Sequence, residues 1–451
     1  MAESSSFFSS LPRMPVLPSL DLPVSLPEWQ GARLTELLTR VGATNRFWQE
    51  KFAQAGCDVS QVRTVADLVR LPFCTKAELL ADQQAHPPYG TNLTEPVAQY
   101  ARLHQTSGTT GAPLRWLDTP RSWEALLGSW RRLFGWLGLR RDDRLFFPFS
   151  FGPFLGFWAG FEGANRLGNL CIAAGGMSTE ARLRLLLDNQ CTIVCCTPTY
   201  ALRLIEQAHA LGLDLAGSSV RGVLVAGEPG GQLATTRGLI EAGFGARVFD
   251  HWGMTEVGPL AMEAEGDPGG LWMLESDCIA EVIDGSTGRP VADGAEGELV
   301  VTTLVRCGMP LFRYRTGDRV RGAGGGGDGL LRLGGGILGR VDEMLTIRGN
   351  NVYPSVLEEL VRQQPGVAEF RVFVRNERAM QQLRVEVEPV AECVGPAVDR
   401  LVDDVARAIR ERFHFRAEVE ATTGLPRFEM KARRFFREPP LPRVADTPGA
   451  Q

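Results

Sequence analysis

The chain has 451 residues, of which 44 % are apolar, so it is long enough to bury a large core and should form two domains. Its 48 basic and 53 acidic residues give a net charge of -5, and no long run of Lys and Arg indicates a nucleic-acid partner. The N-terminus lacks a signal-peptide pattern, and no segment offers about 18 uninterrupted apolar residues. We therefore expect a cytoplasmic protein with neither a nucleic-acid nor a membrane partner.

The nine cysteines are odd in number, lie mostly in apolar runs and include no Cys-x-x-Cys pair. A disulfide framework or a thiolate zinc site is therefore disfavoured. Most of these cysteines are expected to be reduced thiols in the core.

We expect a large domain over residues 28–340, preceded by a Ser- and Pro-rich arm over residues 1–27. The arm is followed by helical spacing of apolar residues as far as Lys76. Between residues 144 and 254, short apolar runs alternate with helical patterns, which predicts a parallel sheet flanked by helices. Half-buried segments between residues 279 and 318 then predict antiparallel strands, and thus a smaller β-rich subdomain closing the large part.

The C-terminal part predicts a small mobile α+β domain over residues 341–440, with a tail over residues 441–451. The glycine-dense stretch 321–340 predicts a flexible excursion at the boundary. The elements expected beyond it are a helix over Pro354–Gln364, strands over Phe370–Arg375 and Gln382–Glu388, a helix over Pro396–Phe413 and a strand near Ala417. The predicted fold class is therefore α/β, with a large N-terminal and a small C-terminal domain.

The first candidate for chemistry is the segment TSGTTG, which contains Thr106, Ser107, Gly108, Thr109, Thr110 and Gly111. Glycines let the backbone approach a polyanion, and hydroxyl and N–H groups can surround phosphate oxygens. An ordinary polar turn is an equally good interpretation of this hexamer alone. It is not a Walker A loop, because no Gly-Lys-Ser/Thr ending follows.

Five segments in order resemble the acyl-adenylate-forming superfamily, and their details are most similar to its phenylacetate-coenzyme A ligase branch. They are TSGTTG at 106–111, HWGMTEVG at 251–258, YRTGDRV at 314–320, GRVDEMLTIRGNNVYP at 339–354 and GLPRFEMKARR at 424–434. The resemblance covers about residues 30–435, and five segments in one order are specific where one alone would be weak. It implies ATP, Mg²⁺ and coenzyme A, and a small domain that rotates between two half-reactions.

The resemblance assigns the phosphate and metal contacts to a Thr-Glu pair. Thr255 matches the residue that contacts the α-phosphate, and Glu256 matches the Mg²⁺ ligand. Attack of a carboxylate on a phosphate needs a divalent cation, a cationic side chain and oriented donors, so these residue types fit the chemistry. A solvated loop acid is the alternative interpretation of Glu256.

Nucleotide contacts are implied in the same way. Asp318 follows a glycine turn and matches the residue that accepts both ribose hydroxyls, although a turn-capping role is open from the sequence alone. Arg340 is expected to touch the nucleotide. Two segments at predicted strand ends resemble those beside adenine, namely Gly227, Glu228 and Pro229, and Asp250, His251 and Trp252.

Assignments in the small domain begin with Lys431, which matches the adenylation lysine whose charge offsets that of the transition state. Without the match, a solvated surface lysine would be the better interpretation. Asp342 matches the hinge between the domains, and Arg348 and Gly349 would lie near the thiol of coenzyme A.

The aromatic stretch 146–158 supplies the candidate acyl pocket, with Phe149, Phe154 and Trp158, and with Tyr200 added by family position. Core packing is the better default for most of these rings. Prolines and glycines interrupt the stretch, however, and leave room in which a flat aromatic acid could fit.

Two features depart from the family pattern. Ala112 stands where a lysine usually follows the phosphate loop, and the nearest cation is Arg115. The regions that hold zinc in some relatives lack closely spaced Cys or His, so no zinc site is predicted.

The predicted function is ATP-dependent activation of a small-molecule carboxylic acid, phenylacetate- or benzoate-like, through an acyl-AMP, followed by thioester formation with coenzyme A. Alternatives are transfer to a carrier-protein thiol or an amine, and a non-catalytic nucleotide-binding relative. Retention of Glu256, Asp318 and Lys431 argues against the last of these. The sequence is compatible with a homodimer.

Overall fold

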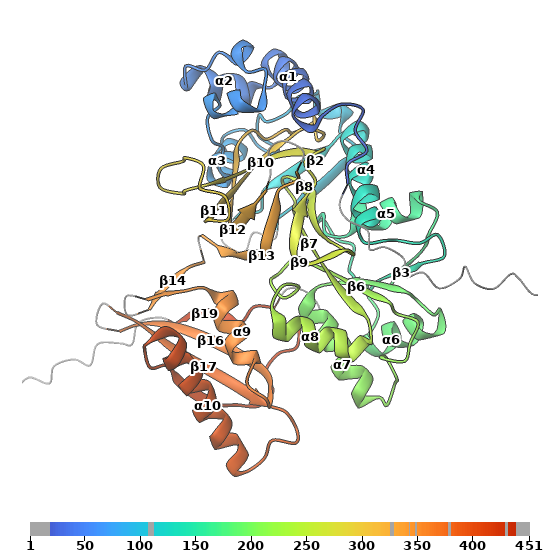
Figure 1. The fold of residues 1–451 in the computed structure, drawn as a ribbon, viewed down its shortest axis with the longest axis vertical. Coiled ribbons are helices and arrows are strands. Elements are labelled where there is room, and N and C mark those ends of the chain that lie inside the picture. The colour runs from blue at the N-terminus through green and yellow to red at the C-terminus, as the bar shows by residue number, and fades with distance from the viewer. Residues whose placement is uncertain are drawn as a thin grey trace, which may run out of the picture.

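The computed structural model describes residues 19–106, 112–324, 329–341, 343–347, 350–377, 380–428 and 432–438. These residues form a large domain and a separate small C-terminal domain, which lies near α7 and α8 (Figure 1). The described helices of the large domain are α1 (Leu26–Thr44), α2 (Arg46–Gln54), α3 (Lys76–Ala85), α4 (Pro120–Trp136), α5 (Trp158–Arg166), α6 (Thr179–Asp188), α7 (Pro198–Ala210) and α8 (Ala234–Phe244). Short 3₁₀ helices span Val59–Gln61, Val65–Arg70 and Val97–Gln99.

The described strands of the large domain form one sheet of eleven strands and a separate hairpin. The parallel strands are β3 (Arg144–Phe147), β4 (Leu170–Ala173), β5 (Ile193–Cys196), β6 (Gly222–Ala226) and β7 (Arg247–Met254). The antiparallel strands are β8 (Gly258–Ala264), β9 (Asp267–Met273), β10 (Cys278–Ile283), β11 (Glu296–Thr303), β12 (Tyr314–Ala323) and β13 (Arg332–Arg340). Because β7 pairs with β6 on one edge and β8 on the other, the predicted β-rich part extends the parallel sheet instead of forming its own.

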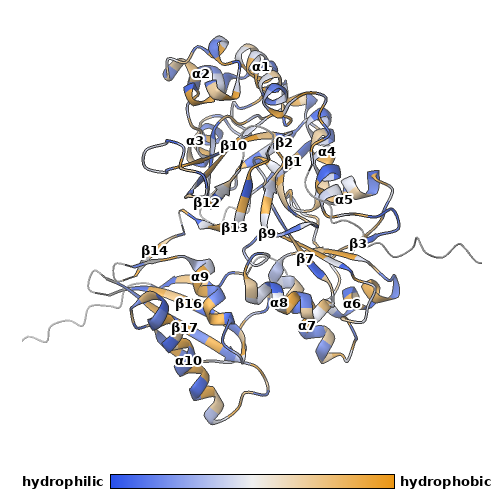
Figure 2. Cartoon of the chain, in the orientation of Figure 1, coloured by the Kyte–Doolittle hydropathy of each residue, from blue (hydrophilic) through white to orange (hydrophobic). Residues whose placement is uncertain are grey.

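Alternate residues of the parallel strands enter two different cores, as a pleated sheet covered on both faces requires. Phe147 packs in the cluster that contains the buried faces of α4 and α5. Its neighbour Phe146 packs in the cluster that contains the buried faces of α6, α7 and α8. Figure 2 shows hydrophobic residues along the sheet between these layers. The predicted parallel sheet flanked by helices is confirmed.

The helical prediction near the N-terminus is also confirmed, because α1 begins after Ser25, whose capping box with Glu28 satisfies the first turn. The buried face of α1 packs with the antiparallel part of the sheet. The hairpin β1 (Arg102–Gln105) and β2 (Arg115–Asp118) lies apart from this sheet. None of the described helices is both long and apolar enough to span a bilayer.

The prediction of a flexible excursion over residues 321–340 is wrong for its second half. β13 pairs with β12, where Asp318 lies opposite Arg340, and with β9. Gly335 and Gly336 adopt φ values of 73° and 66°, which glycine accepts without strain, and Leu333 is fully buried. Glycine here therefore permits an irregular strand within the sheet, and residues 325–328 lie outside the described part.

The small domain has its own core, in which two helices pack with a four-stranded sheet of order β18-β17-β16-β19. Its elements are β14 (Leu345–Ile347), β15 (Asn350–Val352), α9 (Pro354–Arg362), β16 (Val367–Glu377), β17 (Met380–Pro389), α10 (Pro396–Phe413), β18 (Glu418–Ala421) and β19 (Phe435–Glu438). In Figure 2, α10 is striped with hydrophobic and hydrophilic residues, as expected for a helix with one buried face.

Candidate active site

Two predicted nucleotide segments meet at one edge of the sheet. In the pairing of β6 with β7, Ala226 lies opposite His251, so Gly227–Pro229 continues beside Asp250–Trp252. Open α/β sheets bind ligands at the carboxyl ends of parallel strands, and β6 ends here. The structure thus brings both segments together, and their contact with adenine stays a prediction.

Three residues from separate segments of the sequence converge at Asp318 on β12. The carboxylate of Asp318 accepts a hydrogen bond from Trp252 Nε1 at 2.9 Å and pairs with Arg340 Nη1 at 3.2 Å. Asp318 is 4 % exposed, and its backbone N–H donates to Thr316 Oγ1 at 3.0 Å. The predicted ribose-binding carboxylate is therefore held by two of the other predicted nucleotide residues.

The predicted metal ligand, Glu256, is a buried carboxylate with two donors. Tyr314 donates its hydroxyl to Oε1 at 3.4 Å, and Lys76 Nζ lies 3.3 Å from the same oxygen. Lys76 is the first residue of α3, after the capping residue Thr75. Sequence reasoning missed Lys76, because a lysine at an ordinary capped helix start carries no chemical signal. Lys76 supplies a cation close to Glu256. Ala112, which stands where relatives usually have a lysine, supplies none.

A fully buried ion pair connects the hairpin of β1 and β2 with the Thr255–Glu256 segment. Arg306 donates to the two carboxylate oxygens of Asp118, the last residue of β2, at 2.8 and 2.5 Å. It also donates to the carbonyl oxygen of Thr255. Burial alone would raise the pKa of Asp118, but the charge and hydrogen bonds of Arg306 lower it below its usual value. No local pattern indicates this pair, since its residues lie 188 positions apart.

The predicted phosphate loop lies between the two strands of this hairpin. The backbone N–H of Thr106 donates to the carbonyl oxygen of Leu114 at 3.0 Å, and Thr106 Oγ1 accepts a hydrogen bond from the Leu114 N–H at 3.0 Å. Arg115, the cation nearest in sequence, donates to the carbonyl oxygen of Pro88 at 3.0 Å. Ser107 to Gly111 lie outside the described residues.

Two titratable groups lie next to each other on β7, the half-buried Asp250 and the buried His251. Burial lowers the pKa of His251 to about 4, so its ring is neutral and donates from Nδ1 to the Ala261 carbonyl oxygen at 2.7 Å. Burial, with the nearby charge of Glu263, raises the pKa of Asp250 to about 7. Neither Asp250 nor His251 is therefore a cation that could attract a phosphate group.

The candidate acyl-pocket residues are not all on one face of the sheet. Phe149 and Trp158 pack against the cluster beneath α4 and α5, and the half-buried Phe154 lies beside Gly152. Tyr200 is 1 % exposed in the cluster on the other face, where its hydroxyl accepts a hydrogen bond from Arg182 at 2.7 Å. It lies in the first turn of α7, which covers that face, so the structure does not bring it together with Phe149 and Trp158.

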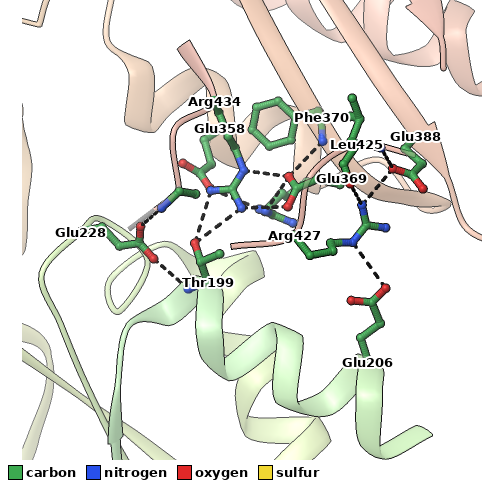
Figure 3. Close-up of polar contacts among 12 residues, drawn as sticks. Thr199, Glu206, Glu228, Glu358, Glu369, Phe370, Glu388, Leu425, Arg427 and Arg434 are labelled. Carbon is green, nitrogen blue, oxygen red and sulfur yellow. Dashed lines mark hydrogen bonds and ion pairs between the residues drawn. The ribbon is translucent and has the colours of Figure 1, made fainter. Parts of the chain in front are cut away.

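Glu228 contacts the small domain. Its carboxylate accepts hydrogen bonds from the backbone N–H groups of Thr199, in the large domain, and Ala432, in the small domain. Figure 3 shows this contact beside Arg434, which sequence reasoning had not singled out. The side chain of Glu228 is thus occupied by protein donors and not turned to an open site.

Several other predicted site residues lie outside the described part of the chain, and their roles stay predictions. They are Asp342, Arg348, Gly349 and Lys431. The described residue before the predicted hinge, Val341, donates its N–H to the carbonyl oxygen of Gly317 at 2.7 Å.

Comparison with known families decides the membership of the chain. Residues 23–304, more than half of the chain, match the family described as AMP-binding enzyme. The chain belongs to the AMP-binding enzyme family. Residues 349–438 match the AMP-binding enzyme C-terminal domain. The resemblance seen in the five sequence segments is confirmed.

This AMP-binding enzyme has relatives that it matches over most of both chains. It is 32 % identical over 396 residues to phenylacetate-coenzyme A ligase from Thermus thermophilus, which covers 85 % of this chain and 87 % of the relative. It is 34 % identical over 363 residues to phenylacetate-coenzyme A ligase from Escherichia coli, with 80 % and 81 % covered.

Solved structures confirm the predicted fold. A 2-hydroxyisobutyryl-CoA ligase in the postadenylation state, in complex with R3-HIB-AMP, superposes with a TM-score of 0.85 at 28 % identity, covering 91 % of this chain and 89 % of the relative. The same ligase in the thioesterification state, with 2-HIB-AMP and CoA, superposes with a TM-score of 0.68 over the same shares.

Proposed function

We propose that this AMP-binding enzyme activates a carboxylic acid with ATP and then joins the acyl group to coenzyme A. The observation that carries the proposal is the convergence of Trp252, Asp318 and Arg340 on β12, whose Tyr314 contacts the buried Glu256. Similarity to phenylacetate-coenzyme A ligases over most of both chains supports the reaction class.

In the first half-reaction, a carboxylate oxygen of the acid attacks the α-phosphorus of ATP, and pyrophosphate leaves with acyl-AMP formed. In the second, the thiol attacks the acyl carbon, and AMP leaves as the thioester forms. Asp318, already held by Trp252 and Arg340, is suited to accept hydrogen bonds from ribose hydroxyls. Lys431 is proposed to offset the negative charge that develops in the first step.

Mg²⁺ is the cation that we propose for the site at Glu256. Proteins hold Mg²⁺ through one or two carboxylates together with substrate phosphates, and the buried Glu256 carboxylate fits that donor set. Within the described part of the chain, no group of three or more His, Cys, Asp or Glu side chains could hold a metal on its own. A cation bound by Glu256 and the phosphates would neutralise phosphate charge.

The acid is proposed to be aromatic, of the phenylacetate or benzoate class. Phe151 packs edge to face with Phe149 and Trp158, with ring centroids 5.5 and 4.7 Å apart, just after the carboxyl end of β3. Such a cluster offers ring edges and faces to a flat ligand. The phenylacetate-coenzyme A ligases among the relatives support the same class.

The test is ATP–pyrophosphate exchange with a panel of aromatic and aliphatic acids, followed by mass spectrometry of the product formed with coenzyme A. An aromatic acid is expected to support both exchange and thioester formation. Exchange without thioester would redirect the second step to a carrier protein or an amine. No exchange with any acid of the panel would contradict the proposed function.

A further inference from the structure

The carboxylate of Glu228 accepts hydrogen bonds from both domains. Glu228 follows β6, and its Oε1 accepts a hydrogen bond from the backbone N–H of Thr199, in the first turn of α7, at 2.9 Å. Its Oε2 accepts one from the backbone N–H of Ala432 at 2.8 Å. Ala432 belongs to the small domain and follows Lys431 directly in the sequence. Figure 3 shows both bonds.

The small domain presents a fixed cation at the same place. Arg434 is 5 % exposed and donates to both carboxylate oxygens of Glu369 at 2.7 and 3.0 Å, and to Glu358 at 3.0 Å. Its Nη1 also reaches Thr199 Oγ1, in the large domain, at 3.4 Å. Because Glu358 and Glu369 lie on α9 and β16, Arg434 is held by its own domain and faces the start of α7.

Glu228 and Arg434 therefore bring opposite charges to the two sides of the boundary. Burial raises the pKa of Glu228, and the hydrogen bonds from Thr199 and the charge of Arg434 act against that rise. A shielded carboxylate is costly unless donors or cations compensate it. Separation of the domains would remove the Ala432 donor and the Arg434 charge together, so the docked arrangement is favoured.

We propose that Glu228, with Thr199 and Arg434, is a positioning residue that fixes the segment after Lys431 for acid activation. This inference rests on the proposed function. The arrangement that contains the contact superposes better on the relative's postadenylation state than on its thioesterification state, with TM-scores of 0.85 and 0.68. The contact would then have to break before the thiol step, and the Glu228 side chain serves docking in place of the adenine contact expected from sequence.

The variant Glu228→Gln tests this role at nearly constant side-chain volume. It removes the charge and turns one acceptor into a donor that faces a backbone N–H. Exchange of pyrophosphate into ATP should fall about tenfold or more, since charge-assisted hydrogen bonds are lost. Thioester formation from supplied acyl-AMP should fall far less, which makes the ratio of the two rates the diagnostic quantity.

Glu206→Gln is the matched control. Glu206 also pairs across the boundary, with Arg427 at 3.4 Å, but its side chain is 47 % exposed. Exposed pairs contribute little, so both half-reactions should stay within about twofold of the unaltered enzyme. Equal slowing of both half-reactions by Glu228→Gln would overturn the proposal, because ATP and acyl-AMP share the adenine that a binding residue would contact.

Hydrogen–deuterium exchange provides a readout that needs no substrate. In the ligand-free full chain, Glu228→Gln should speed exchange in the residue 432–438 segment and in the first turn of α7, while the cores of both domains stay protected. Unchanged protection in these two segments would overturn the proposal. This measurement can be interpreted even if the enzyme does not catalyse the proposed reaction. The docking role of Glu228 and the proposed function can therefore fail separately.

Discussion

The Asp118–Arg306 pair and the Glu228–Ala432 contact both use a shielded carboxylate, but they lie at different boundaries. Asp118 and Arg306 belong to one domain, are at most 1 % exposed and share two hydrogen bonds. Glu228 reaches the other domain through one hydrogen bond to a backbone N–H. The difference suggests a division of roles: the predicted phosphate and metal segments are tied together in a frame within one domain, whereas we propose that the segment after Lys431 has an attachment that is released.

The largest effect is expected from Lys431→Ala, next to the segment that contacts Glu228 between the domains. Loss of one preorganised cation should lower pyrophosphate exchange by about 10²–10³-fold, with thioester formation from supplied acyl-AMP largely kept. The exposed neighbour Arg433 provides the control Arg433→Ala, which should leave exchange nearly unchanged. Equal loss of both half-reactions in Lys431→Ala would break the distinction between frame and attachment.

The frame is tested by Arg306→Met, which leaves Asp118 buried without its partner. The free energy of unfolding should fall by about 3–5 kcal/mol, measured by chemical denaturation. The double variant Asp118→Leu/Arg306→Met should recover most of that stability, since two apolar side chains of similar size replace the pair.

Catalysis separates a positioning role for Arg306 from a purely structural one. The double variant lacks the hydrogen bond to the Thr255 carbonyl, so both half-reactions should stay slow even though the chain is stable. This pattern differs from that of Glu228→Gln, which should affect only one half-reaction strongly. A double variant with normal rates would show that the pair serves folding alone.

A smaller effect is expected from Lys76→Met, which removes the cation 3.3 Å from Glu256. Its side chain is 41 % exposed, so we expect a fall of about tenfold in pyrophosphate exchange, the size of one charge-assisted contact. Lys51→Met is the control, because Lys51 pairs with Glu78 and not with Glu256. Equal rates of pyrophosphate exchange in the two variants would show that Lys76 does not assist acid activation.

The smallest effect concerns stability and a residue that belongs to neither contact. Burial raises the pKa of Glu275 to about 7, while its carboxylate accepts the N–H of Leu331 at 2.7 Å. The folded chain therefore binds this proton more tightly than the unfolded chain, and stability falls as pH rises from about 4 to about 7. Glu275→Gln removes this fall. The Tm of the variant minus the Tm of the unaltered enzyme should therefore be roughly 2–4 °C larger in mildly alkaline than in mildly acidic buffer. A constant Tm difference would contradict the raised pKa.

Much of the fold could be predicted from local patterns. Val, Ile and Cys runs between helical patterns gave the parallel sheet, and the start of α10 at Pro396 and its end at Phe413 match the prediction. The strand β13 was missed because glycines usually indicate flexibility, and only the pairing with β9 and β12 shows that their missing side chains suit the sheet. Long-range pairing has no local signal.

The site divides in a similar way. Trp252, Asp318 and Arg340 were predicted because each lies in a recognisable segment, and the structure adds that Asp318 contacts the other two. Lys76 and Arg306 act through contacts with distant parts of the chain, which no spacing rule reveals. Tyr200 was grouped with the other aromatic residues by family position, whereas the helix that carries it covers the opposite face of the sheet.

The nine unpaired cysteines have a consequence for an enzyme that makes a reactive mixed anhydride. Cys196 ends β5, at the sheet edge where the parallel strands finish. Burial, with the charge of Glu228, raises the pKa of its thiol well above the ordinary value. Only the thiolate is an effective nucleophile, so this sulfur stays inert toward an activated acyl group. Cys196 is thereby kept from being acylated while the enzyme waits for its thiol substrate.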